Sequence, residues 1–348
     1  MRLVFTALLA ISVASAADLT VGTAIAHPGQ RVTGVIQVPA GSDAATNLPV
    51  IVVNGARSGP TMALVAGAHG TEYASIVALQ KLARMLDPAA LTGAVIVTPL
   101  LNIASFTQVV PHINPVDGKG MNRAYPGKAD GTQTERALHA MTTQVLQKAD
   151  YLIDLHGGDL DENLRRYSYW ADTGNLAMDA TSRGMVLAFG LDHIIIQHNR
   201  TPLAPGAPVT VSRQAQNMGK PTIVAEAGRA GTVEAQDVDD LVYGCLNVMR
   251  YLKMLPGTAP AVEHPIWINS ATIVPADREG VFVPIARPEA YVQKGQVIAR
   301  ITDYFGEPVA DVTSPVTGVI IYIRAIPSLK KGDTMADIGE TGPDPVSR

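Results

Sequence analysis

The sequence predicts an α/β protein with a doubly wound, mainly parallel β-sheet covered by helices, followed by a small C-terminal β-barrel. Between residues 62 and 255, short apolar runs alternate with segments whose apolar residues recur at helical spacing, a pattern that favours a parallel sheet. Beyond the proline-containing segment 258–265, only strand-like runs remain. The chain has 348 residues, which corresponds to about two domains of ordinary size.

Composition limits the classes of protein and of site. Apolar residues make up 47% and charged residues 17% of the chain, which excludes collagen-like, coiled-coil and disordered proteins. The net charge of −4 provides no broad basic field, so we expect no nucleic acid as partner. Cys245 is the single cysteine, so a bound metal would need histidine and carboxylate ligands.

The first residues, 1–16, are typical of a signal peptide. Positive charge at Arg2 precedes a mostly apolar run at 3–13, and small residues at 14–16 offer a signal-peptidase site. The run is shorter than the ~20 residues that span a bilayer, so a retained membrane anchor is the weaker alternative. We expect cleavage after residue 16, a secreted or periplasmic location and no stable membrane insertion.

The predicted α/β domain covers 48–257, preceded by a β segment at 17–47 with proline and glycine turns. Its first unit is a strand at 62–68, a turn and a helix at 71–86, because Ile76, Leu79 and Ala83 recur at helical spacing. Further strands are predicted at 94–101, 151–155, 194–196 and 222–225, and further helices at 134–148 and 233–255. The carboxyl ends of such strands are where ligands bind in open α/β sheets.

The last part of the chain, 258–348, is predicted to be a linker and a β-barrel. Strand-like runs lie at 280–286, 291–302, 309–323 and 335–338. Residues 291–301 and 328–338 align without a gap as an internal repeat, which indicates two similar halves.

Two histidines and a glutamate follow predicted strand ends. His69 and Glu72 lie in one strand-to-helix turn, and His156 ends the strand at 151–155. Two histidines with one glutamate suit a catalytic zinc ion that keeps an open position. Asp154 is a candidate acceptor for an imidazole N–H. The alternatives are a surface His–Glu pair for the first motif and a capping histidine for the second.

Two further motifs offer a base and a substrate anchor. Glu226 closes the apolar strand at 222–225, where a buried carboxylate needs a cation nearby, and a general base beside zinc-bound water would meet that need. The alternative is a structural ion pair with Arg229. Asn122 and Arg123 lie in a proline- and glycine-rich stretch and could hold a substrate carboxylate, whereas a solvated arginine is the alternative.

Four motifs in this order resemble those of the succinylglutamate desuccinylase/aspartoacylase family, within the zinc carboxypeptidase-like superfamily: His69-x-x-Glu72, Asn122-Arg123, Asp154-Leu155-His156 and Glu226. The resemblance covers about 48–338, because that family also places a small β-barrel after its catalytic domain. It implies one Zn²⁺ per chain and assigns the roles as follows. His69, Glu72 and His156 would be metal ligands, Glu226 the base and proton shuttle, and Asn122 with Arg123 the carboxylate anchor.

The sequence departs from the family pattern at one position. Many members carry an arginine three residues before the loop proline, where it polarises the scissile carbonyl, and this chain has His112 before Pro115. A histidine could take that role as a donor, or zinc alone could stabilise the oxyanion. The following charged stretch at 159–167 is either a specificity loop or a solvated one.

The expected activity is zinc-dependent hydrolysis of an amide bond, with an N-acyl amino acid or related small carboxylate as substrate. One alternative is a secreted zinc carboxypeptidase that acts on short peptides. Another is a non-catalytic metal- or ligand-binding protein. The C-terminal repeat resembles a biotinyl/lipoyl-like barrel, but the hairpin at 303–307 has no lysine to carry a cofactor. The sequence leaves the oligomeric state open.

Overall fold

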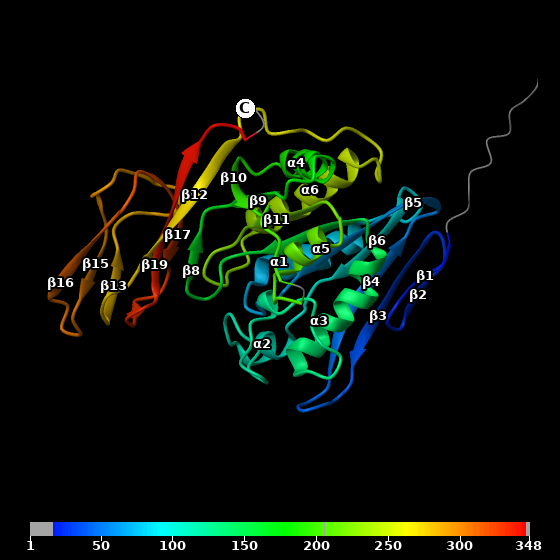
Figure 1. Ribbon diagram of the computed structural model, residues 1–348, viewed down its shortest axis with the longest axis horizontal. Coiled ribbons are helices and arrows are strands. Elements are labelled where there is room, and N and C mark those ends of the chain that lie inside the picture. Colours follow the sequence, from blue (N-terminus) through cyan, green and yellow to red (C-terminus); the bar gives the residue numbers. More distant parts are fainter. Residues whose placement is uncertain (1–16, 205, 346–348) are drawn as a thin grey trace, which may run out of the picture.

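The structure is a computed structural model that describes residues 17–204 and 206–345, so the predicted signal peptide at 1–16 lies outside the described residues. In the described part of the chain, the strands form sheets of 13, 4 and 2 strands (Figure 1). The α-helices are α1 (Tyr73–Met85), α2 (Ile103–Gln108), α3 (Gln133–Gln144), α4 (Leu176–Phe189), α5 (Val211–Asn217) and α6 (Ala235–Tyr251), with short 3-10 helices η1 (Met121–Arg123) and η2 (Leu146–Lys148).

The large sheet has the order β14, β17, β19, β12, β10, β9, β11, β7, β5, β6, β4, β3, and β8 pairs with β17 in addition. Its strands are β3 (Gln30–Val38), β4 (Thr46–Asn54), β5 (Arg57–Ala66), β6 (Thr92–Thr98), β7 (Tyr151–His156), β8 (Glu162–Leu164), β9 (Tyr167–Asp172), β10 (His193–His198), β11 (Thr222–Glu226), β12 (Ile266–Pro275), β14 (Tyr291–Val292), β17 (Gly318–Arg324) and β19 (Thr334–Gly342). The two-stranded sheet contains β1 (Leu19–Val21) and β2 (Ala24–Ala26).

The sheet is mixed, which corrects the prediction of a mainly parallel one. Its centre is parallel as expected, with β6, β5, β7 and β11 side by side. However, β9 runs antiparallel to β11, and β10 and β12 then follow the direction of β9. β3 and β4 add an antiparallel edge. The short strands β8 and β9 were not predicted, because their polar and aromatic residues lack the long apolar run that marks a buried strand.

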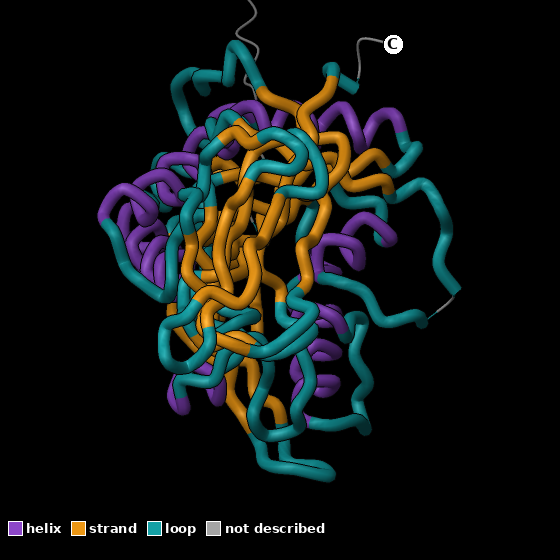
Figure 2. The backbone as a smooth tube through the Cα atoms, turned by 90° about the vertical axis from the view of Figure 1, so that its left-hand side faces the viewer, coloured by secondary structure: helices purple, strands orange, loops and turns teal. Residues whose placement is uncertain are grey.

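Helices cover both faces of the parallel centre, as Figure 2 shows. Successive residues of β5 point to opposite faces: Met62 and Leu64 belong to the core beneath α1, α4 and α6, whereas Ala63 and Val65 belong to the core beneath α3 and α5. A strand buried on both sides needs apolar side chains at every position. The continuous run at 62–66 therefore forms an interior strand, and its carboxyl end opens toward the site.

The C-terminal strands form two sheets that share one core. The second sheet has the order β16 (Pro308–Thr313), β15 (Val297–Thr302), β13 (Gly280–Pro284), β18 (Ser328–Leu329). The first copy of the predicted repeat forms β14 and β15, and the second copy forms β18 and β19. The short strands of the two copies occupy equivalent positions, because β14 pairs with β17 and β18 pairs with β13. The same holds for the long strands, because β15 pairs with β16 and β19 pairs with β12. The strands are confirmed, whereas a closed barrel is not.

The C-terminal strands are continuous with the α/β part of the molecule. β12 pairs with β10 in parallel, and its Trp267 is buried in the core beneath α1, α4 and α6. The division at 257/258 stays a prediction. None of the described helices has the length and apolar character needed to cross a membrane.

Candidate metal centre and active site

The turn after β5 places His69 and Glu72 together. Gly67 adopts a left-handed conformation with φ of 67°, which glycine tolerates without strain. Glu72 is the N-cap residue of α1 but makes no side-chain capping bond. Its carboxylate points instead to His69, with 2.5 Å between Oε1 and Nδ1.

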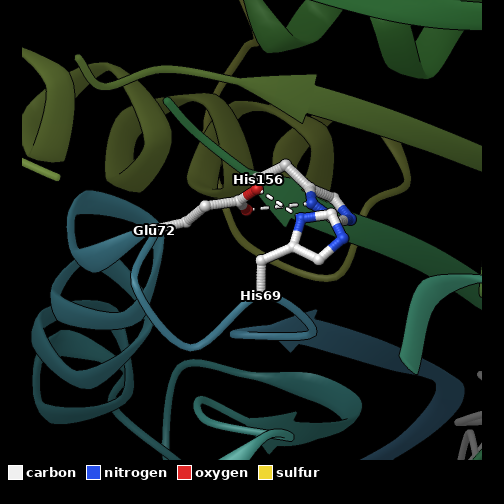
Figure 3. A group of neighbouring side chains, drawn as sticks. All are labelled: His69, Glu72 and His156. Carbon is white, nitrogen blue, oxygen red and sulfur yellow. Dashed lines mark hydrogen bonds and ion pairs between the residues drawn. The ribbon is translucent and has the colours of Figure 1, made fainter. Parts of the chain in front are cut away.

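His156, at the end of β7, completes the group. Its Nδ1 lies 2.9 Å from Oε2 of Glu72, and the backbone N–H of Gly157 donates to the same oxygen at 3.2 Å. The possible ligand atoms of His69, Glu72 and His156 all lie within 4.8 Å of one another, and Figure 3 shows the three side chains converging. Glu72 and His156 are buried, and His69 is the more accessible member. Three predicted ligands therefore meet at one point.

The chemistry around these side chains fits a cation. Burial opposes the charged form of Glu72, but His69 and His156 lower its pKa to about 2. Burial also opposes a charged His156, yet Asp154 and Glu72 raise its pKa well above the usual value. Buried carboxylates here require positive charge, which a metal ion bound to neutral imidazoles supplies in place of protons.

Orphaned buried oxygens support the same conclusion. Asp154 Oδ2 lies 3.3 Å from His156 Nε2, and Asn122 Nδ2 lies 3.3 Å from the same nitrogen. The other oxygens, Asp154 Oδ1 and Asn122 Oδ1, have no hydrogen-bond partner among the described residues. Buried acceptors normally have a partner, so this region can accept water or ligand groups. Asp154 occupies the position predicted for an acceptor beside a metal-bound imidazole.

Glu226 lies beside His156 on the neighbouring strand. The register pairs Glu226 of β11 with His156 of β7 on one side and with Tyr167 of β9 on the other. Burial and the charges of Glu72 and Glu162 raise the pKa of Glu226 well above its usual range, against a lowering by His156. Arg229 pairs instead with Glu289, at 3.0 Å, so the alternative of a Glu226–Arg229 ion pair is not observed.

His112 lies near the predicted metal ligands, and both of its ring nitrogens contact carboxylates. Its ring centroid is 6.0 Å from that of His69. Nε2 lies 2.8 Å from Asp161, and Nδ1 lies 3.2 Å from Asp159. The hydrogen bond to Asp161 is the main cause that raises the pKa of His112 to about 9, so it is an imidazolium at neutral pH. Direct donation to an oxyanion would require exchange of one of these contacts, and this role stays a prediction.

The stretch after His156 is not a solvated loop. Asp159 is fully buried and accepts hydrogen bonds from the hydroxyl of Thr71 and the backbone N–H groups of Leu160 and His112. Asp161 bridges His112 to Arg324 of β17. The acidic residues of this stretch therefore hold the site together.

The two predicted anchor residues differ in their environments. Asn122 reaches His156, as described above, whereas Arg123 is exposed and its side chain has no polar partner among the described residues. Both belong to η1. A guanidinium without a protein partner is available to a ligand, and its role in carboxylate binding stays a prediction.

Several residues near the site were not predicted. Burial and the charge of Glu72 raise the pKa of Glu162 to about 7. Tyr167 and Tyr169 lie on β9 with their hydroxyls 3.4 Å apart. Tyr322 lies opposite Leu164 across the β8–β17 pair. The sequence carried a signal for Glu162 and Tyr167, which belong to the charged stretch at 159–167, but none for Tyr169 and Tyr322.

Comparison with known proteins identifies the family that the sequence motifs resemble. A sequence model of the succinylglutamate desuccinylase/aspartoacylase catalytic domain matches residues 58–252, more than half of the chain. The N-α-acetyl-L-2,4-diaminobutyric acid deacetylase of Halomonas elongata is 28% identical over 321 residues, which cover 88% of this chain and 91% of that protein.

Solved structures share the fold over nearly the whole chain. A succinylglutamate desuccinylase/aspartoacylase from Rhodobacter sphaeroides is 25% identical with a TM-score of 0.78, covering 90% of this chain and 96% of that one. The product-bound ectoine utilization protein EutE (DoeB) from Ruegeria pomeroyi is 25% identical with a TM-score of 0.79, covering 89% and 95%. The chain therefore belongs to the succinylglutamate desuccinylase/aspartoacylase family, as its motifs predicted.

Proposed function

We propose that this protein is a zinc-dependent amidohydrolase that removes the acyl group from an N-acyl amino acid. The observation that carries the proposal is the convergence of His69, Glu72 and His156, with Glu226 next to His156 in the sheet register. Membership of a deacylase family and similarity to the Halomonas elongata deacetylase support the reaction class. The donor set of two imidazoles and one carboxylate supports zinc.

The residues of this chain divide the work of the hydrolysis. When bound at this site, Zn²⁺ would lower the pKa of a water molecule toward neutrality and polarise the amide carbonyl. Glu226 takes a proton from the attacking water as the new C–O bond forms. It then gives that proton to the amine nitrogen as the C–N bond breaks, so the products are a carboxylate and a free amine. The cation beside Glu226 would also bring its raised pKa back down, as a base requires.

The remaining site residues orient the substrate. Asn122 and Arg123 are proposed to hold its carboxylate, since a guanidinium can bind a carboxylate with two parallel hydrogen bonds. The imidazolium of His112 adds positive charge close to His69, where the carbonyl oxygen gains negative charge. These roles separate binding from chemistry, and kinetics can distinguish them.

The test uses protein that begins at residue 17, with zinc content measured before and after chelation. N-acyl amino acids, including N-α-acetyl-L-2,4-diaminobutyrate, and short peptides form the substrate panel. We expect one zinc per chain and chelator-sensitive release of an amino acid. Glu226→Gln should lower kcat by at least about 100-fold with zinc content unchanged, whereas Arg123→Ala should mainly raise KM. Retained turnover in Glu226→Gln would refute the assigned base.

Other outcomes separate the alternatives. Release of a C-terminal residue from peptides, with no deacylation, would favour the carboxypeptidase. Zinc binding without hydrolysis would favour a binding protein. Failure to bind zinc after reconstitution would refute the metal centre itself.

Export remains part of the proposal. The pattern at 1–16 supports it, and the expected mature N-terminus is Ala17. Intact-mass analysis of the protein from its native cell fraction tests this, and a retained N-terminus in the cytoplasmic fraction would contradict it.

A further inference from the structure

One face of the large sheet extends from the metal centre to the C-terminal strands. Residues directly paired across strands point to the same side of a sheet, so His156, Glu226 and Tyr167 share a face through their register. Tyr169 lies two residues beyond Tyr167 on that face. The floor of the site is therefore built from β7, β11 and β9.

Side chains of β12 and β17 pack against this floor of the site. Ile321 of β17 and Ile268 of β12 pack with Tyr167, and Tyr169 packs against this cluster. Asp337 lies opposite Tyr322 in the β17–β19 pair. Its neighbours Ala336 and Ile338 point into the separate C-terminal core, so Asp337 points to the catalytic side. In Figure 1 these strands lie beside β8, which pairs with β17.

Asp337 carries a buried oxygen that lacks a partner. Its Oδ1 is inaccessible to solvent and has no hydrogen bond among the described residues. Neither does Asp337 take part in any of the ion pairs recorded between described residues. Burial raises the pKa of Asp337 to about 6, although a hydrogen bond from the backbone N–H of Ile338 opposes this rise. A buried carboxylate with an unfilled acceptor is costly unless a cation or donor completes it.

Tyr169 links this carboxylate to the catalytic residues. Burial raises the pKa of the Tyr169 phenol, and the negative charges of Glu226 and Asp337 raise it further. Tyr169 therefore lies within the electrostatic reach of both carboxylates. A carboxylate within electrostatic reach of a tyrosine is a favourable environment for an organic ammonium group, which binds to negative charge and to the faces of aromatic rings.

We propose that Asp337, together with Tyr169, recognises a positively charged group on the substrate, and that the enzyme prefers N-acyl amino acids whose side chain carries an ammonium. This inference rests on the proposed function for its catalytic consequence, but the binding subsite stands on the geometry of β19 and β9. Asn122 and Arg123 would hold the carboxylate end of the same molecule. Asp337 is a binding residue here and takes no part in proton transfer.

The charge of the subsite predicts an order of substrates. A cationic side chain gains an ion pair with Asp337, a neutral side chain of equal length does not, and an anionic side chain is repelled. N-α-acetyl-L-2,4-diaminobutyrate, N-acetyl-L-norvaline and N-acetyl-L-glutamate are probes of the three kinds. The expected order of kcat/KM is cationic, then neutral, then anionic, with at least about tenfold between the first two.

The variant Asp337→Asn keeps the side-chain shape and removes the charge. We expect the ratio of kcat/KM for the cationic probe to that for the neutral probe to fall at least about tenfold. Asp311→Asn is the matched control, because Asp311 is an exposed aspartate on β16 that pairs with Arg300. It should leave the ratio unchanged. Thermal melting of both variants verifies that they fold.

A binding measurement separates this inference from the proposed function. Calorimetric titration should show L-2,4-diaminobutyrate binding more tightly than L-norvaline to the wild type, with the difference lost in Asp337→Asn. If this holds but no N-acyl amino acid is hydrolysed, the subsite stands and the proposed function fails. If N-acyl amino acids are hydrolysed without preference for the cationic probe, the subsite is refuted and the proposed function stands. Absence of both hydrolysis and selective binding refutes both.

Discussion

Asp159 determines where His112 lies. It accepts from the backbone N–H of His112 at 2.9 Å, and its charge faces Nδ1 of the same residue. It also accepts a hydrogen bond from the hydroxyl of Thr71, next to Glu72, which is a predicted metal ligand. One buried carboxylate thus ties three loops together. His112 and the stretch at 159–167 were both candidates from the sequence, but a contact between residues 47 apart in the chain depends on how the chain folds.

The convergence of the predicted metal ligands was easier to predict than the position of His112, for a physical reason. His69 follows β5 and His156 is the last residue of β7, and the carboxyl ends of such parallel strands meet at one edge of the sheet. The pattern of strands is therefore enough to predict that these residues lie close together. The same reasoning applies to Glu226, which is the last residue of β11. Arg123 lies in the short helix η1 and His112 lies on a loop, and no comparable rule places either of them.

The raised pKa of His112 predicts a pH-dependent contribution to stability. A group whose pKa is about 9 in the folded state and about 6.5 when unfolded stabilises the fold fully below pH 6.5 and loses that effect as pH rises through 9. Compared with His112→Gln, the wild type should be more stable by about 1 kcal/mol at pH 6, given solvent screening of this half-exposed side chain. The difference should vanish by about pH 10, well above the folded-state pKa.

Urea unfolding of both proteins at a series of pH values measures this difference. Because the variant lacks only the titrating ring, subtracting the two curves isolates His112 together with the carboxylates that interact with it, Asp159, Asp161 and Glu162. A difference that stays constant from pH 6 to pH 10 would show that His112 is not charged by Asp159 and Asp161.

At the scale of elements, apolar runs were more informative than polar ones. The predicted strands at 62–68, 151–155 and 222–225 correspond to β5, β7 and β11, whose burial on both faces leaves a continuous apolar signal. β9 was missed, because its residues 167–172 mix polar and aromatic side chains. Because β9 runs antiparallel to β11, the sheet is mixed and Tyr167 lies opposite Glu226.

The turn after β7 depends on glycine at a close approach. A Cβ on Gly157 would lie 2.4 Å from the carbonyl oxygen of Ala227, so Gly157→Ala must move either the β7 or the β11 end. We expect a loss of about 1–3 kcal/mol in the free energy of unfolding and weaker zinc binding, because His156 is the adjacent residue. Gly120→Ala is the control, since its nearest contact would be at 3.8 Å. Equal stability and zinc affinity of the two variants would contradict the steric argument.

At the scale of the whole molecule, β12 connects the two predicted parts of the chain, the α/β domain that ends at residue 257 and the C-terminal part that begins at residue 258. This strand was not predicted, because the polar residues Asn269 and Ser270 interrupt its apolar run. Trp267 of β12 lies in the core of the α/β part, with its ring 5.9 Å from that of Trp170 and the guanidinium of Arg183 5.4 Å away. β17 adds a second connection through β8. The junction is therefore built from both parts of the chain.

This junction predicts that the molecule unfolds as one cooperative unit. Trp170 and Trp267 are the two tryptophans of the chain, so fluorescence reports on the junction, whereas far-ultraviolet circular dichroism reports on all helices and strands. The two signals should give coincident denaturant transitions. Trp267→Ala should lower the free energy of unfolding by about 3–5 kcal/mol and shift both transitions together. A fluorescence transition that precedes the dichroism transition would instead show that the C-terminal strands detach first and that the two parts fold as separate domains.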